Sequence, residues 1–346
     1  MESVARVADY GSIRRSAEVV PLSQLLPLDT PLSLLIDPSN GCNFKCVFCP
    51  TGDAELLATV GRKPKAMRLE TFEKIINGLQ RFPKRIKVLH LYKDGEPLVN
   101  KSLGSMVAIA KQSCRFERIE TTTNGALLTK ERALELIDAG IDGIRISIYG
   151  LDDESYAKAT GSNISLEAIR ANVASLFELK NQKRSAVHVH CKTIDTNLSS
   201  DERRRFFTLF QDISDSIHID SLMGWSNTRN RDLMLGTQPP TGMSGAPLRP
   251  DRKVCSEPFM RLAVNSNGRV SVCCVDWSHE TSVGDISEET LFEIWNGERL
   301  REFRIKHLEG RRHELKACAD CQYLLGLGPH TYLDAHAQEL LNRYTN

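Results

Sequence analysis

Hydrophobic and polar residues alternate with two different periods along residues 34–221. Short apolar runs typical of buried strands occur at 34–37, 86–91, 119–122, 144–148, 187–194 and 217–221. Between these runs, apolar residues recur every three or four positions at 69–79, 103–110, 130–139, 165–179 and 201–210. This second period predicts amphipathic helices. Six strands that alternate with helices predict an α/β fold with a parallel sheet and right-handed crossovers, which is either a doubly wound sheet or a barrel.

The segments on either side of this block have a different character. Residues 1–33 are mixed in composition, and we expect an N-terminal extension that packs on the main domain, 34–222. Residues 223–254 are rich in Gly, Pro, Asn, Thr and Arg, which predicts a linker or insert. In a small C-terminal domain, 255–346, two short strands flank Asn267-Gly268 and predict a hairpin. Helical patterns follow at 289–295, at 300–308 and from about residue 333.

Composition argues against several classes of protein. The formal net charge of +1 over 346 residues gives no electrostatic basis for binding nucleic acid or an acidic membrane surface. No apolar run approaches the roughly 18 residues that a membrane-spanning helix needs, and the N-terminus lacks the apolar core of an export signal. We therefore expect a cytoplasmic protein. Ten cysteines in such a chain indicate metal or redox chemistry rather than a disulfide framework.

A CxxxCxxC array follows the first predicted strand and consists of Cys42, Cys46 and Cys49. Three thiolates on one loop can hold three corners of a [4Fe–4S] cube, which leaves the fourth iron open for chemistry. A zinc ion would need a fourth ligand from elsewhere in the chain. Ligands in α/β folds gather at the carboxyl ends of strands, and the array lies at such an end. The aromatic ring of Phe48 would shield a cluster there from water.

This array resembles that of the radical S-adenosylmethionine (SAM) superfamily. The sequence Lys93-Asp94-Gly95-Glu96-Pro97 is similar to the superfamily's Gly-Gly-Glu-Pro motif, with Asp94 in place of the first glycine. The resemblance implies a partial (β/α)6 barrel in which the open iron of a [4Fe–4S] cluster binds SAM. It also implies a reductant, such as flavodoxin or ferredoxin, that supplies the electron for SAM cleavage.

The resemblance also assigns residues to the SAM site. Gly95 and Glu96 would contact the amino group of SAM, and Thr123 and Asn124 would form a turn that lines the adenosine pocket. Ser147 resembles a serine of the fourth strand that contacts SAM in relatives. These five residues are the expected cofactor-binding set.

Polar side chains alternate along the fifth predicted strand, where His188, His190 and Lys192 share one face. Polar groups inside a barrel cost free energy unless they are paired, so these side chains are expected to bind substrate or SAM. His190 and Lys192 are therefore candidate catalytic residues. The alternative is that some of these side chains lie at the barrel mouth and are hydrated. In the insert, three residues are candidates for clamping substrate hydroxyl or carboxylate groups: Arg229, Asn230 and Arg231. A solvated loop explains these three residues equally well.

Four further cysteines lie in the C-terminal domain: Cys255, Cys273, Cys318 and Cys321. Four sulfur ligands suit either zinc or an iron–sulfur cluster. The spacing of these cysteines, the hairpin and the late CxxC pair resemble the twitch variant of the SPASM domain, which implies one auxiliary [4Fe–4S] cluster with four cysteine ligands.

Cys274 is left over beside Cys273. In a related epimerase such a cysteine donates a hydrogen atom, whereas the alternative is a small buried apolar residue. Neighbours on a strand point to opposite faces, so Cys274 is expected to face away from the cluster and into the core of the C-terminal domain.

Taken together, the resemblance implies an enzyme whose 5′-deoxyadenosyl radical removes a hydrogen atom from a carbohydrate or aminocyclitol carbon. The expected product is a ketone, with the auxiliary cluster accepting the electron, as in 2-deoxy-scyllo-inosamine dehydrogenases. The alternatives are a redox-neutral epimerase, a glycuronic acid decarboxylase, a peptide-modifying maturase and a non-enzymatic metal protein. The expected partners are a small-molecule substrate and the reductant, without nucleic acid or a membrane.

Overall fold

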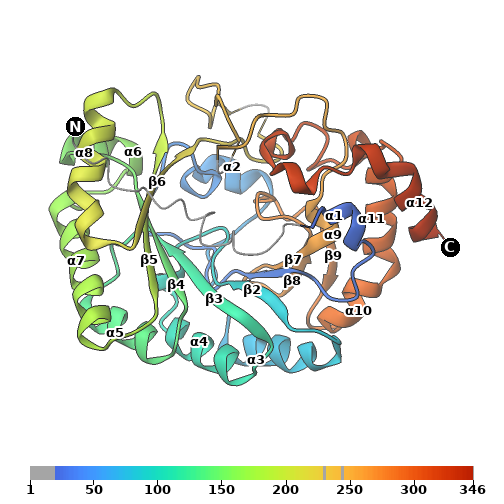
Figure 1. The fold of residues 1–346 in the computed structure, drawn as a ribbon, viewed down its shortest axis with the longest axis horizontal. Helices are drawn as coiled ribbons and strands as arrows, with labels where there is room; N and C mark the ends of the chain where they lie inside the picture. The colour runs from blue at the N-terminus through green and yellow to red at the C-terminus, as the bar shows by residue number, and fades with distance from the viewer. Residues whose placement is uncertain (1–19, 229–230, 243–244, 346) are drawn as a thin grey trace.

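The computed structural model describes residues 20–228, 231–242 and 245–345, and among them nine strands form one sheet. The first six strands are parallel and neighbour one another in chain order (Figure 1). They are β1 (Ser33–Ile36), β2 (Ile86–His90), β3 (Phe116–Thr123), β4 (Gly143–Ile148), β5 (His188–Asp195) and β6 (Ser216–Ser221). The predicted α/β fold with a parallel sheet is therefore confirmed, and the sheet is the partial barrel that the resemblance implied.

The C-terminal domain continues this sheet at its other edge. Strand β7 (Arg261–Val264) pairs parallel to β1, and β8 (Arg269–Ser271) and β9 (Ser282–Asp285) follow in antiparallel order. The predicted hairpin joins β7 to β8, and its Gly268 has a φ of +93°, a conformation that favours glycine. The pairing of β7 with β1 brings the two cysteine-rich regions onto one continuous sheet.

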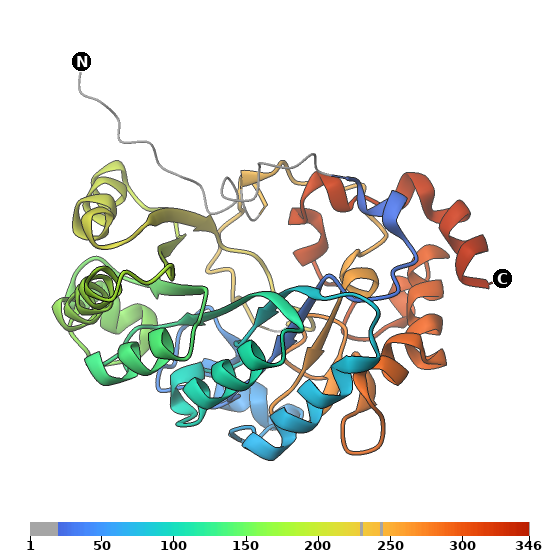
Figure 2. The same ribbon diagram turned by 60° about the horizontal axis from the view of Figure 1, so that its bottom comes forward.

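Helices cover the outer side of the parallel strands (Figures 1 and 2). They are α3 (Leu69–Gly78), α4 (Leu103–Gln112), α5 (Lys130–Asp138), α7 (Leu166–Gln182) and α8 (Ser200–Phe210). Each lies within three residues of the predicted range at either end. Within the parallel part of the fold, the shorter helices α2 (Ala54–Thr59) and α6 (Asp153–Thr160) were not predicted. Among the helices described here, none is both long and apolar enough to cross a membrane.

Alternation along the strands separates an apolar outer face from a polar inner face. In β4, Ile144, Ile146 and Ile148 belong to the hydrophobic core, whereas Arg145 and Ser147 occupy the other face. In β5, Val189 and Cys191 likewise join the core. The intervening His188, His190 and Lys192 share the opposite face, as predicted, and they contact polar residues of β6.

The chain before β1 packs on the C-terminal domain. Helix α1 (Leu22–Leu25) lies beside α12 (Ala337–Thr345) in both ribbon views (Figures 1 and 2), and Arg343 Nη1 donates to the Leu26 carbonyl at 2.7 Å. One apolar cluster joins them: Leu22, Leu26, Val254, Phe259, Leu308, Leu333, Leu340 and Tyr344. The expectation that the extension packs on the main domain is confirmed for its last residues, where the Thr30 hydroxyl accepts a hydrogen bond from the Lys84 N–H at 3.4 Å and the Leu32 carbonyl accepts one from the Lys87 N–H at 3.0 Å. It is wrong for Leu22 and Leu26, which cover the small core of the C-terminal domain instead. Residues 1–19 lie outside the described chain.

Candidate functional site

The CxxxCxxC loop leaves the carboxyl end of β1, and its three sulfurs lie near enough to affect one another's ionisation. Burial raises the pKa of Cys42 to about 12, and the neighbouring charge of Cys49 adds to the effect. The same two causes raise the pKa of Cys46. These thiols are therefore protonated when free, and a cationic metal centre would displace the protons on binding. Three such thiols on one loop suit three corners of an iron–sulfur cube.

Helix α6 holds this loop in place, which the sequence did not reveal. The carbonyls of Ala159 and Thr160, at the end of α6, accept hydrogen bonds from the backbone N–H groups of Val47 (3.0 Å) and Lys45 (2.7 Å). Gly161 then ends the helix with a φ of +60°. The cysteine loop is thus anchored to the barrel between its first and last ligand.

Glu96 links the loop after β2 to the loop after β3. Its buried carboxylate accepts hydrogen bonds from Thr123 Oγ1 at 2.7 Å, from the Asn124 backbone N–H at 2.8 Å and from the Leu98 backbone N–H at 3.0 Å. Three of the expected cofactor-binding residues therefore form one cluster. Glu96 positions the two loops within the protein, and its contact with SAM stays a prediction.

Gly95 and Asn124 bring this cluster against the cysteine loop. A Cβ atom on Gly95 would lie 2.3 Å from the carbonyl oxygen of Gly41, so only glycine fits there. Asn124 Nδ2 donates to Asn43 Oδ1 at 2.8 Å, directly beside Cys42. The Gly-Glu-Pro motif, the Thr123-Asn124 turn and the cysteines hence meet at one end of the barrel.

Asp94, which replaces a glycine of the superfamily motif, lies at the centre of a buried ionic cluster. Its carboxylate lies 2.6 Å from His279 Nε2, 2.9 Å from Lys93 Nζ and 3.7 Å from Arg62 Nη1. Burial alone would raise the pKa of Asp94, but the charges of Lys93 and Arg62 and the His279 hydrogen bond hold it well below its usual range. Asp94 is therefore ionised at neutral pH.

The same cluster joins the barrel to the C-terminal domain. Lys93 Nζ donates to the Asp276 carbonyl at 2.9 Å, and Arg62 Nη1 donates to the Trp277 carbonyl at 2.8 Å. With His279, these residues place the 276–279 loop of the C-terminal domain against the SAM motif. The replacement of glycine by Asp94 was visible in the sequence, but nothing there indicated its partners.

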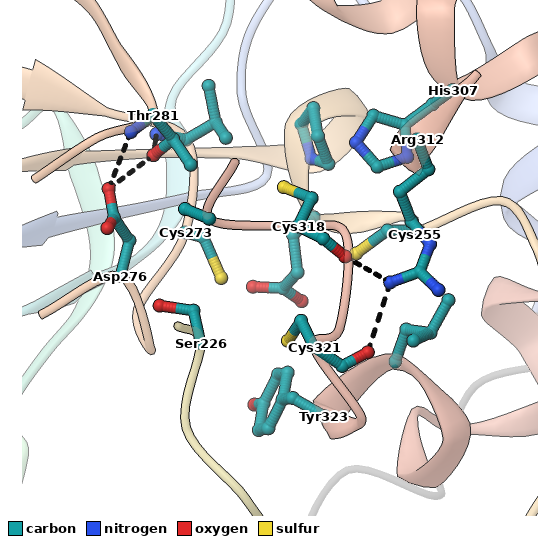
Figure 3. A pocket seen from close by; sticks show the side chains of 15 residues that line it. Ser226, Cys255, Cys273, Asp276, Thr281, His307, Arg312, Cys318, Cys321 and Tyr323 are labelled. Atoms are coloured by element: carbon teal, nitrogen blue, oxygen red, sulfur yellow. Dashed lines mark hydrogen bonds between the residues drawn. The ribbon is translucent and has the colours of Figure 1, made fainter. Parts of the chain in front are cut away.

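The four cysteines of the C-terminal domain come from three separate segments and line one cavity. Figure 3 shows the sulfurs of Cys255, Cys273, Cys318 and Cys321 directed toward the same hollow. Arg312 Nη1 donates hydrogen bonds to the carbonyl oxygens of Cys318 and Cys321 and so fixes the CxxC turn (Figure 3).

No three of these sulfurs form a compact single-ion site in the described structure. Two thiolates bound to one zinc at about 2.3 Å cannot lie more than about 4.6 Å apart. Within the described part of the chain, no three of the four cysteines have sulfurs within 4.8 Å of one another, and the group that does meet this spacing is Glu257, Cys273 and Cys274. A four-iron cube holds its thiolates farther apart, because each binds a different iron.

Cys274 does not face away from Cys273, so the expectation from strand alternation is wrong. Strand β8 ends at Ser271, and both cysteines lie in the loop beyond it, where the two-residue period no longer applies. Cys274 Sγ lies 3.6 Å from Tyr323 Oη and 3.8 Å from Glu257 Oε2. The thiol is therefore at the edge of the four-cysteine cavity, which Glu257 and Tyr323 also line.

The inner face of the barrel carries the expected polar residues of β5 in pairs with those of β6. Lys192 Nζ lies 2.8 Å from Asp220 Oδ2, and His218 Nε2 lies 3.6 Å from the other oxygen of Asp220. Ser147 of β4 is buried and in register with Lys192, which is in register with His218. Donors and acceptors from three neighbouring strands thus line one part of the barrel wall.

His190 lies one layer away from this group and is nearly fully buried. Its Nδ1 lies 2.7 Å from Ser216 Oγ, which also contacts His188 Nε2 at 2.7 Å. Burial lowers the pKa of His190 to about 3, and the charge of Arg145 contributes. His190 is therefore a neutral, packed side chain at pH 7, and its catalytic role stays a prediction.

The predicted substrate clamp in the insert does not form around Arg231. Its guanidinium pairs with Asp53 and Glu55 at 2.8 Å each, at the start of α2. Arg231 is therefore committed to a surface ion pair. Arg229 and Asn230 lie outside the described residues.

Two domain models match the chain at the two cysteine sites. Residues 36–193 match the radical SAM superfamily, and residues 255–322 match the SPASM iron–sulfur cluster-binding domain. The fold and the sites define an iron–sulfur protein built on a partial (β/α) barrel. More specifically, residues 36–193 form a radical SAM domain and residues 255–322 form a SPASM domain, and these two domains imply [4Fe–4S] clusters and SAM as cofactors.

Curated relatives match only part of the chain. GTP 3′,8-cyclase of Aeromonas hydrophila is 31% identical over 137 residues, which are 39% of this chain and 39% of that protein. The probable GTP 3′,8-cyclase of Methanosarcina mazei is 36% identical over 129 residues, which are 37% of this chain and 36% of that protein. The chain thus matches about two fifths of the length of these relatives.

Solved structures match most of the chain at low identity. The structure of BtrN in complex with AdoMet and 2-DOIA is 17% identical, with a TM-score of 0.52, and the match covers 84% of this chain and 93% of that one. Streptococcus suis SuiB bound to its precursor peptide SuiA is 13% identical, with a TM-score of 0.62, over 82% of this chain and 69% of that one. At these identities the similarity shows the fold alone.

Proposed function

We propose that this radical SAM enzyme dehydrogenates a hydroxyl-bearing small molecule, a carbohydrate or aminocyclitol, to a ketone. The observation that carries the proposal is the C-terminal site, where four cysteines line one cavity. A cluster with four thiolate ligands has no open iron for substrate, so electron acceptance suits it better than substrate binding. BtrN, whose fold is similar, has been solved in complex with AdoMet and 2-DOIA. GTP cyclisation is not carried over, since the matched segments cover too little of those relatives.

The polar barrel wall supports a hydroxylated substrate. Lys192 offers ammonium donors, Asp220 offers carboxylate acceptors, and His218 and Ser147 add groups of both kinds. A few converging polar groups of this sort fix the orientation of a polyol in a pocket. We infer that Lys192 and Asp220 bind neighbouring hydroxyl or amino groups of the substrate.

The proposed reaction divides between the cofactors and the side chains of this chain. When bound, the cluster on Cys42, Cys46 and Cys49 supplies the electron that cleaves SAM to methionine and the radical that removes hydrogen. The protein keeps that radical dry and near one carbon. Phe48 contributes by packing against Tyr149, with ring centroids 5.0 Å apart, over the cysteine loop.

Oxidation of the hydroxyl also requires a proton acceptor. His218 faces Asp220 through Nε2, so its Nδ1 is the atom that would take the hydroxyl proton. The electron left on the substrate carbon would pass to the auxiliary cluster, and the carbonyl forms.

The Cys318→Ala variant tests this function. If the auxiliary cluster accepts the electron, the variant should lose ketone formation while it still forms 5′-deoxyadenosine from SAM. Iron content and circular dichroism establish that only the second cluster is missing, since metal loss can unfold such a domain. An unchanged ketone yield in a folded variant without its second cluster contradicts the proposal.

A redox-neutral epimerase is the second candidate, and the position of Cys274 favours it. Its thiol lies beside Glu257 and Tyr323 at the edge of the auxiliary site. Mass spectrometry of candidate sugars turned over in deuterated water separates the two functions. Dehydrogenation removes two hydrogens, epimerisation incorporates one deuterium, and decarboxylation of a glycuronic acid gives a larger loss of mass.

A further inference from the structure

His307 is a polar side chain that the functions described above leave without a role. It lies in α11 (Glu298–Leu308), is fully buried and lines the cavity of the four cysteines, where Figure 3 labels it. Neither ring nitrogen has a hydrogen-bond partner among the described residues. The Phe303 ring lies 5.3 Å from the imidazole, centroid to centroid, and holds it from one side.

Burying the His307 side chain without a hydrogen-bond partner costs free energy when the cavity is empty. Burial lowers the pKa of His307 to about 3, and the charge of Arg312 contributes. The imidazole is therefore neutral, with one N–H donor and one acceptor nitrogen. A buried donor without an acceptor costs free energy, and nearly all such groups in native proteins are paired.

The other polar side chains of the cavity have partners inside the protein. Ser226 Oγ donates to the Val275 carbonyl at 2.8 Å, and Thr281 Oγ1 donates to Asp276 at 2.7 Å. Arg312 donates to the carbonyls of the CxxC turn. Glu257 Oε1 has no hydrogen-bond partner, but Oε2 of the same carboxyl group lies 3.2 Å from Arg261 Nε. His307 is thus a neutral donor that lines the cavity without a described acceptor.

We propose that His307 donates an N–H···S hydrogen bond to the auxiliary cluster and thereby raises its reduction potential. The sulfides and thiolates of an iron–sulfur cluster are anionic acceptors, and hydrogen bonds to them help to set the potential. Reduction adds negative charge to the cluster, so a donor stabilises the reduced form more than the oxidised form. Under the proposed dehydrogenase function this makes the cluster a better electron acceptor, although the hydrogen bond itself does not depend on that function.

Redox titration of the full-length, reconstituted protein without substrate tests the proposal. His307→Phe removes the donor and keeps an aromatic ring, whereas His307→Gln retains an N–H group. Electron paramagnetic resonance of each variant gives the potential of each cluster. We expect His307→Phe to keep its full iron content. At a fixed potential, the ratio of reduced to oxidised auxiliary cluster should be roughly tenfold smaller than in the unmodified protein, which corresponds to a reduction potential lower by about 59 mV for one electron. His307→Gln should recover part of this shift.

Two controls accompany the titration. The potential of the SAM-binding cluster should not change in either variant. His336→Phe alters an exposed histidine of the same domain and should leave the reduction potentials of both clusters unchanged. An unchanged auxiliary potential in an iron-replete His307→Phe variant overturns the proposal. Loss of half the iron in both His307 variants also overturns it, because His307 would then be a ligand or a folding residue.

A measurement on the unmodified sequence covers the case in which the variants fail to fold. Protein labelled with 15N-histidine and reduced at the auxiliary cluster should show a histidine nitrogen hyperfine coupling in pulsed electron paramagnetic resonance. The absence of any histidine coupling contradicts the hydrogen bond. Because no substrate is present, neither experiment depends on the reaction that the enzyme performs.

Discussion

The two cysteine sites of this chain are built in opposite ways. The SAM-binding site takes Cys42, Cys46 and Cys49 from one loop. The auxiliary site takes its four cysteines from three segments that only the fold brings together, and it encloses its cavity with buried side chains. A local site with a missing ligand leaves an iron open for chemistry, whereas an assembled site with four ligands is closed and suits electron transfer.

The largest effect should come from the local site. Replacing Cys42, Cys46 and Cys49 by Ala together should abolish SAM cleavage, because these thiolates hold the cluster that reduces SAM. Iron should fall from about eight to about four atoms per chain, since the auxiliary site is a separate unit. Iron analysis and chromatography of 5′-deoxyadenosine measure both quantities. Zinc in the C-terminal domain and only four irons in the unmodified protein would disprove the auxiliary cluster.

The ionic cluster of Asp94 connects the two sites, and its removal should be the next largest effect. Asp94→Ala leaves the buried charges of Lys93 and Arg62 without their anion, which typically costs about 3–5 kcal/mol. A surface pair of the same kind, Lys84 with Asp29 at 2.9 Å, should contribute less than about 1 kcal/mol. Thermal unfolding of Asp94→Ala and Asp29→Ala compares the two directly.

Asp94→Gly sharpens this comparison, because it restores the residue of the superfamily motif. If it unfolds at the same temperature as the unmodified protein, the ionic cluster does not hold the two domains together. We expect it to behave like Asp94→Ala instead. Weaker SAM binding in both variants would indicate that the cluster also positions the SAM motif.

The fold could be predicted where each element is long enough to repeat its pattern. The alternation of Ile144, Arg145, Ile146 and Ser147 identified β4, and the helices that cover the sheet have similarly clear periods. Helix α6 buries Tyr156 and Thr160 alone, and β9 has the sequence Ser-Val-Gly-Asp, so neither shows a clear apolar period. The pairing of β7 with β1 joins two strands that are far apart in the sequence, which no local pattern encodes.

The same limit applies to the functional site. The cysteine array and the Gly95-Glu96 motif are local, and the sequence identified both. Asp94 and His279 are separated by most of the chain, and either residue alone resembles an ordinary loop residue. His307 falls within a predicted helix, and only the folded structure places it at the cavity.

Asp37 provides a test of the local site through the pH dependence of the protein's stability. Burial raises the pKa of Asp37 to about 7, and the neighbouring charge of Asp94 adds to this. The folded protein therefore keeps a proton that the unfolded chain releases near pH 4, and stability should fall as the pH rises from about 4 to 7. Asp37→Asn should remove this dependence and stabilise the protein at pH 8 by on the order of 2 kcal/mol. Unfolding temperatures of the unmodified protein and of Asp37→Asn at pH 5 and pH 8 measure this dependence. An equal fall in unfolding temperature between the two pH values in both proteins would contradict the raised pKa of Asp37.

The smallest effect should come from Cys274, at the edge of the assembled site. Its thiol contacts Glu257 and Tyr323 but is not one of the four cysteines of the cavity. A dehydrogenase needs no hydrogen-atom donor, so Cys274→Ala should keep substantial turnover and lose about 1 kcal/mol of stability, as expected for a small truncation. Product and 5′-deoxyadenosine are quantified in the same reaction, with Cys114→Ala as a control at an exposed cysteine outside both sites. If Cys274→Ala still forms 5′-deoxyadenosine but no product, the thiol returns a hydrogen atom to the substrate radical, and the epimerase replaces the dehydrogenase as the function of this chain.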